Sequence, residues 1–168
     1  MRWLLLISMA VLMACSDRTA APVLPEALNI GINRTVFIGT TRAMNAAGEF
    51  GIGRSPTLSL LQSEVSIPPD REIGSMSDGF DKPKPERDFV LASLDRHNDR
   101  QSFAASLSRE IDRSSEAGRR EVTVFVHGFN NSFADSAFRM AQMGHDLDVP
   151  GALVSYSWPS RANPLGYE

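Results

Sequence analysis

The residues best suited to chemistry in this 168-residue chain are His127, Gly128, Phe129 and Asn130. They follow residues 121–126 (Glu-Val-Thr-Val-Phe-Val), where five of the six side chains are β-branched or aromatic, a pattern that predicts a buried strand. The glycine, asparagines and serine that come next end a strand and begin a helix. Such a junction leaves backbone N–H groups at the carboxyl edge of a sheet, where oxyanions are stabilised. The sequence therefore predicts one half of a hydrolytic site.

A helix and a second strand are expected to hold this loop in place. Ser132-x-x-Asp135 is a near capping box, so a helix is predicted from Ser132 to about Leu147. Its apolar residues fall on one face: Phe133, Ala137, Met140, Ala141, Gly144 and Leu147. Residues 152–158 predict the next strand, which Pro159 closes. Strand, helix and strand at these intervals predict a βαβ unit of a mostly parallel sheet.

The upstream half reads as strands separated by loops. Residues 34–41 predict a strand, residues 42–56 a turn-rich loop, and residues 57–67 a strand or a bent pair of strands. A short strand is expected over residues 89–94. A helix is expected over residues 102–116, opened by the pair Asn98 and Gln101. The sequence Gly51-x-Gly53 is followed by no helix, which argues against a phosphate-binding loop.

The composition of the chain argues against several classes of function. The net charge of −3 and the absence of a visible basic face argue against a nucleic-acid or anionic-membrane binder. Three histidines and one cysteine provide no zinc site of usual spacing and no internal disulfide. We expect neither a metal nor an organic cofactor.

The N-terminus has the pattern of a targeting segment. Arg2 precedes an apolar run from Trp3 to Met13, which is too short to span a bilayer and suits a secretory signal. The sequence Leu12-Met13-Ala14-Cys15 resembles the bacterial lipobox, which implies cleavage before Cys15 and lipidation of its thiol. Ser16 directly follows this cysteine. It resembles the pattern of lipoproteins that go to the outer membrane, because retention in the inner membrane usually goes with Asp at this position. An ordinary signal peptide, with a periplasmic product, is the alternative.

Three segments together resemble one family. Residues 124–133 (Val-Phe-Val-His-Gly-Phe-Asn-Asn-Ser-Phe), 137–147 and 156–161 are similar to bacterial α/β-hydrolases of the esterase/lipase superfamily, in a group of unknown function. The resemblance implies that Phe129 lends its backbone N–H to an oxyanion hole, that Gly128 permits the close turn and that His127 shapes the loop. Asn130 would orient the loop or meet substrate, unless it serves only as a neighbour of the helix cap.

The catalytic groups of that family are not found. Its nucleophile elbow, Gly-x-Ser-x-Gly, does not occur, and the nearest imitation is Ser75-Met76-Ser77-Asp78-Gly79, which reads as a surface loop. The chain reaches Glu168 where the family would begin the helix before its nucleophile strand. That strand would pair beside residues 121–126, so we expect an unpaired apolar edge that invites aggregation or pairing with another chain.

These features predict a signal peptide at residues 1–14, a lipidated Cys15 and tether over residues 15–33, and the N-terminal part of an α/β-hydrolase fold, incomplete at its C-terminus, over residues 34–168. Two functions stay open at this point. The first is the front part of an envelope-anchored serine esterase that acts on carboxylic esters. The second is a non-catalytic, membrane-anchored binding or assembly module.

Overall fold

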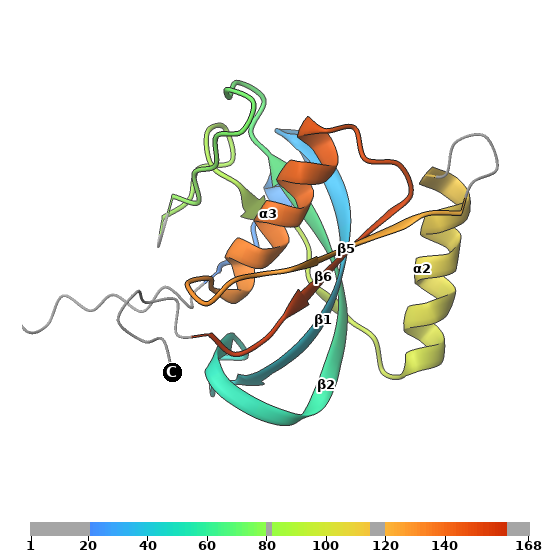
Figure 1. Ribbon diagram of the computed structural model, residues 1–168. Helices are drawn as coiled ribbons and strands as arrows, with labels where there is room; N and C mark the ends of the chain where they lie inside the picture. The colour runs from blue at the N-terminus through green and yellow to red at the C-terminus, as the bar shows by residue number, and fades with distance from the viewer. Residues whose placement is uncertain (1–20, 80–81, 115–119, 161–168) are drawn as a thin grey trace, which may run out of the picture.

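The computed structural model describes residues 21–79, 82–114 and 120–160. The predicted signal peptide and Cys15 lie outside these residues. Within them, no helix is long and apolar enough to cross a bilayer. The chain forms one mixed sheet with a helix on each face, as Figure 1 shows.

The sheet has six strands, in the order β3-β2-β1-β6-β5, and β4 pairs with β2 outside this path. The strands are β1 (Ile32–Met44), β2 (Phe50–Ile67), β3 (Val90–Leu91), β4 (Asp95–Arg96), β5 (Val122–Val126) and β6 (Ala152–Ser157). The pairs β1–β6 and β6–β5 are parallel, whereas the pairs that β2 makes are antiparallel. The parallel pairing is thus confined to the half of the sheet that contains β5.

Strands β1 and β2 form a long hairpin, and this corrects the prediction of a loop over residues 42–56. The turn occupies only residues 45–49, where the Asn45 side chain accepts the backbone N–H groups of Ala47 and Glu49, each at 2.9 Å. Gly51 and Gly53 lie within β2. A Cβ at Gly53 would lie 3.3 Å from the Cβ of Ala43, so the absence of a side chain eases the close approach of the two strands.

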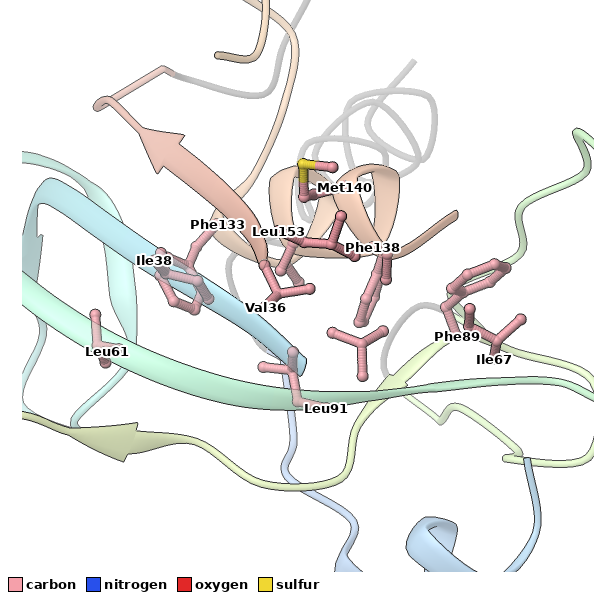
Figure 2. Packing of buried hydrophobic residues seen from close by; sticks show 14 of the residues in the cluster. Val36, Ile38, Leu61, Ile67, Phe89, Leu91, Phe133, Phe138, Met140 and Leu153 are labelled. Carbon is pink, nitrogen blue, oxygen red and sulfur yellow. The ribbon is translucent and has the colours of Figure 1, made fainter. Parts of the chain in front are cut away.

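Helix α3 (Phe133–Asp146) covers one face of the sheet and forms the main core with it. The predicted capping box is confirmed: the Ser132 hydroxyl accepts the Asp135 N–H, and the Asp135 carboxylate accepts the Ser132 N–H. Figure 2 shows the apolar side chains of α3 packed against those of the strands. They include Val36, Ile38, Leu61, Leu91, Phe133, Phe138, Met140 and Leu153.

Helix α2 (Arg100–Ser114) lies against the other face and is held less firmly. None of its residues is buried, and the clearest contact is an edge-to-face pair of Phe103 with Phe37, 5.5 Å between ring centres. The predicted cap of Asn98 and Gln101 was wrong. Asp99 caps the helix, because its carboxylate accepts the Ser102 N–H at 2.7 Å.

The segment predicted as a tether is ordered in its described part. Pro25–Asn29 forms a short 3-10 helix, η2, and Ala27 is fully buried. Val23 bridges to Leu91, and the Leu24 N–H donates to the Leu91 carbonyl at 2.8 Å. Residues 23–24 therefore cover β3 at one edge of the sheet.

Candidate oxyanion loop

The loop from His127 to Asn131 lies at the carboxyl end of β5, as predicted. Pairing of β5 with β6 ends at Val126 and Tyr156, and Ser132 already caps α3. The N–H groups of Gly128 and Asn130 have no hydrogen-bond acceptor among the described residues. These two amides are therefore available to an anionic group above the end of the strand.

Gly128 leaves open space beside the backbone of the loop, and its own backbone conformation does not require glycine. Its φ is not positive, and a Cβ built there would meet nothing within 4 Å. The neighbouring Phe129 side chain is 42% exposed, whereas the Asn130 Oδ1 is buried and accepts no hydrogen bond from the described residues. A ligand could therefore approach the backbone of the loop at Gly128 without displacing a side chain there.

The buried side chain of His127 holds the loop in place by ring stacking and hydrogen bonds. The side chain is 3% exposed, and its ring stacks on Trp158 with 5.2 Å between ring centres. Its Nδ1 lies 2.6 Å from the Gly128 carbonyl, and the Trp158 indole N–H donates to the His127 carbonyl at 2.8 Å. Burial is the main cause that lowers the pKa of His127, so the ring is neutral near pH 7. This is the geometry of a residue that orients a loop.

Ser157 lies close to His127 but is not placed to act as a nucleophile. Its Oγ is 3.4 Å from the His127 Nε2, a pairing that could suggest a Ser–His dyad. The side chain, however, is fully buried, and its oxygen accepts the Nε–H of Arg42 at 2.9 Å. A substrate carbonyl could not reach this hydroxyl without opening the sheet.

Arg42 ties the loop to the rest of the sheet, and sequence reasoning missed it. The guanidinium is 1% exposed and donates to the carbonyls of Asn131 (2.8 Å), Ser160 (3.0 Å) and Gly51 (3.1 Å). Burial lowers the pKa of Arg42 to about 10, against the opposing effect of nearby Asp135. The one signal in the sequence was an arginine next to a predicted strand, which is too common to single out.

Ser160 completes the support of the loop. Its hydroxyl donates to the Phe129 carbonyl and lies 3.4 Å from the backbone nitrogen of Asn131. The residue is buried, although it comes after the end of β6. Backbone atoms on both sides of Asn130 are thus held by one hydroxyl.

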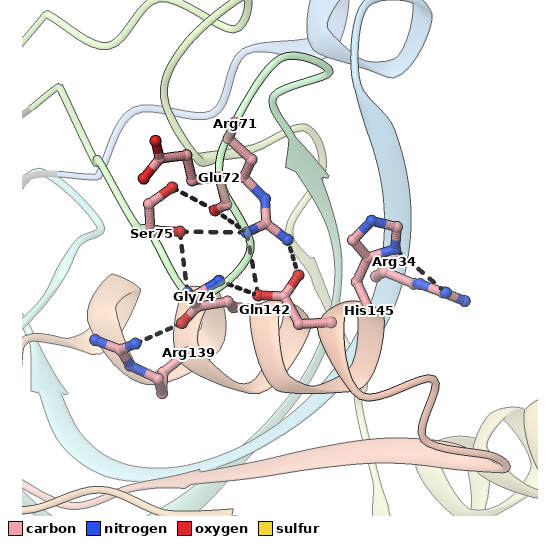
Figure 3. A network of polar contacts seen from close by, with 9 residues as sticks. Arg34, Arg71, Glu72, Gly74, Ser75, Arg139, Gln142 and His145 are labelled. Carbon is pink, nitrogen blue, oxygen red and sulfur yellow. Dashed lines mark hydrogen bonds and ion pairs between the residues drawn. The ribbon is translucent and has the colours of Figure 1, made fainter.

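The serine-rich stretch at residues 75–79 lies elsewhere and has a structural role. It belongs to the connection between β2 and β3, which docks on α3 through the polar network in Figure 3. In that network Arg71 forms an ion pair with Asp146, and the Gln142 amide donates to the Ser75 carbonyl at 2.9 Å. His145 contacts Arg34 at 3.5 Å, away from the loop.

Comparison of the sequence with models of protein families gives a match over part of the chain. Residues 99–168 match the model of a family described as "Alpha/beta hydrolase of unknown function (DUF900)". No curated protein and no solved structure matches the chain. The matched segment is less than half of the chain but contains α2, β5, the loop, α3 and β6. Over this segment the chain is similar to α/β hydrolases, and its mixed sheet with flanking helices is consistent with that type of fold.

Proposed function

We propose that this chain supplies the oxyanion-stabilising part of a serine hydrolase that acts on carboxylic esters. The observation that carries the proposal is that the amides of Gly128 and Asn130, at the end of the parallel strand β5, have no acceptor among the described residues. The negative charge that develops on an ester carbonyl during attack needs such fixed donors. The match to an α/β hydrolase family over the same residues supports the proposal.

The attacking group would come from outside these residues. Ester hydrolysis in this type of fold needs a serine at a sharp turn, an acid and a histidine, in that chain order. The Gly-x-Ser-x-Gly pattern does not occur in the sequence, and the buried Ser157 cannot replace it. Fixed donors alone polarise a carbonyl but open no acyl-enzyme route.

We further propose that the protein is held at the bacterial outer membrane by a lipid on Cys15. The support is the sequence Leu12-Met13-Ala14-Cys15 after an apolar run. Replacement of Cys15 by serine should release the protein from the membrane fraction. Membrane association that persists unchanged in this variant would contradict lipidation.

The coding DNA past codon 168, read in all three frames, tests the enzyme proposal first. A Gly-x-Ser-x-Gly followed by an aspartate and a histidine supports it. In the longer product, Asn130→Pro removes one of the two backbone N–H groups, whereas the matched control Asn130→Ala keeps it. We expect the proline variant to lose roughly 10²–10³-fold in kcat on p-nitrophenyl butyrate and the alanine variant to change little. Equal losses in both variants would contradict a role for the amide.

A second function, a membrane-anchored assembly module, is favoured by one specific observation. Among the described residues, strand β5 is the last strand of the sheet and has an apolar, uncharged edge, which natural proteins usually protect. Such an edge suits the binding of another polypeptide. The absence of a nucleophile motif in all three reading frames would favour this function over the enzyme.

A further inference from the structure

A cavity of about 700 Å³ lies where strand β2, the end of strand β4 and the start of helix α2 meet. Its wall consists of two short segments, residues 56–60 of β2 and residues 96–100, all of them within the described part of the chain. A volume of this size is typical of sites for small organic ligands. The cavity shares no lining residue with the oxyanion loop.

Basic side chains dominate the charge of this cavity. Arg96, His97 and Arg100 line it, against one carboxylate, that of Asp99. This carboxylate is already engaged, because it caps α2 and accepts the Ser102 N–H at 2.7 Å. The Arg100 guanidinium has no hydrogen bond or ion pair with any described residue. A guanidinium that lines a cavity without an acidic partner favours an anionic ligand.

The other two basic residues are held in place at the wall. Arg96 donates to the Ser59 hydroxyl at 3.2 Å. The His97 N–H donates to the Leu60 carbonyl at 2.9 Å, and its ring meets Phe103 edge to face, 5.4 Å between ring centres. The His97 Nε2 is buried without a hydrogen-bond partner among the described residues, so a proton on it would be unsatisfied. The neutral ring therefore carries its proton on Nδ1, the nitrogen that stays available to a ligand.

We propose that this cavity binds a phosphate monoester, with Arg96, Arg100 and the His97 Nδ1–H as the groups that hold the phosphate. A phosphate monoester has three terminal oxygens and about two negative charges near pH 7, which matches several donors better than a carboxylate with two oxygens and one charge. Two guanidiniums are too few for a nucleic acid, which needs basic groups along a series of phosphates.

The organic part of the ligand lies against the β2 segment of the wall. This segment contributes three apolar residues, Pro56, Leu58 and Leu60, and Leu58 is 46% exposed. A soluble phosphomonoester and the head group of phosphatidic acid present the same phosphate, but only the lipid adds acyl carbons that can cover Leu58. The proposal does not rest on ester hydrolysis, so failure of either proposal leaves the other standing.

Titration of the purified full chain with inorganic phosphate, followed by amide chemical shifts at constant ionic strength, tests the site. We expect saturable shifts concentrated in residues 57–60 and 96–100. Arg100→Gln should weaken binding by roughly tenfold, the equivalent of one charge-assisted hydrogen bond. The matched control Arg109→Gln removes the same charge from α2 outside the cavity and should weaken binding by less than about twofold.

Glycerol 3-phosphate and dihexanoyl phosphatidic acid, the latter below its critical micelle concentration, distinguish the two sources of phosphate. Tighter binding of the lipid, with added shifts at Leu58, assigns a lipid head group, whereas equal binding assigns a soluble phosphomonoester; both results support a phosphate site. The proposal would be overturned by no saturable shift up to about 20 mM inorganic phosphate, far above a millimolar Kd. Equal weakening in Arg100→Gln and Arg109→Gln, or acetate that binds as tightly as phosphate, would also overturn it.

Discussion

Replacement of Arg42 by methionine should destabilise the fold and release the loop. The change keeps a long side chain but removes four hydrogen bonds, to Asn131, Ser160, Gly51 and the Ser157 hydroxyl. Each lost bond leaves a largely buried acceptor without its partner, which costs about 1 kcal/mol. Relief from burying the cation, which already lowers the pKa of Arg42 to about 10, offsets part of this sum. We therefore expect a loss of about 3 kcal/mol in the free energy of unfolding.

Urea unfolding, followed by circular dichroism and by Trp158 fluorescence in a Trp3→Phe background, measures this effect. Trp158 stacks on His127, so its emission also reports on the base of the loop. The control is Arg109→Met, because Arg109 is exposed on α2 and, within the described part of the chain, bonds only to the Ser106 hydroxyl. It should cost less than about 0.5 kcal/mol. A loss below about 1 kcal/mol for Arg42→Met, with unchanged Trp158 emission, would refute the role given to Arg42.

Three further predictions concern the elements around the loop. Ser132→Ala should cost about 1 kcal/mol in urea unfolding, because it removes the cap of α3; no change would mean that the cap is not formed in solution. Gly144→Ala should cost about 1–3 kcal/mol, since its Cβ would lie 2.3 Å from a Leu153 methyl group, while Gly128→Ala should be nearly neutral; similar effects would contradict the packing. Burial lowers the pKa of His127, so the unfolded chain binds the proton more readily, and stability should fall as the pH drops below about 6.5. His127→Asn should flatten this slope between about pH 8 and pH 5, although His145, whose pKa is also lowered, adds to what remains; equal slopes would count against a buried neutral His127.

The parts of the fold that depend on local signals could be predicted from the sequence. Strand β5, helix α3 and strand β6 begin and end within one residue of the predicted positions. In these elements, the spacing of apolar residues, the helix cap and the turn residues are all set by amino acids a few positions apart. The Ser132 and Asp135 capping box is an example. The position of the loop between β5 and α3 followed from the same local pattern, while its role in binding an oxyanion stays a prediction.

The parts that depend on distant contacts could not be predicted. Residues 42–56 read as a loop because of their glycines, yet pairing with β1 makes most of them a strand. Arg42 gains its role only because the fold brings Gly51, Asn131 and Ser160 to it. The apolar run of β5 predicted a buried strand, and this was wrong for Val122, Val124 and Val126, which are exposed in the described structure.

Hydrolysis of p-nitrophenyl butyrate by the purified 168-residue chain is the most direct test of whether the molecule holds only the oxyanion half of a hydrolytic site. We predict no release of p-nitrophenol above the rate in buffer. Turnover that a serine-directed phosphonate abolishes would contradict this, because it would require an accessible nucleophile and a base within these residues.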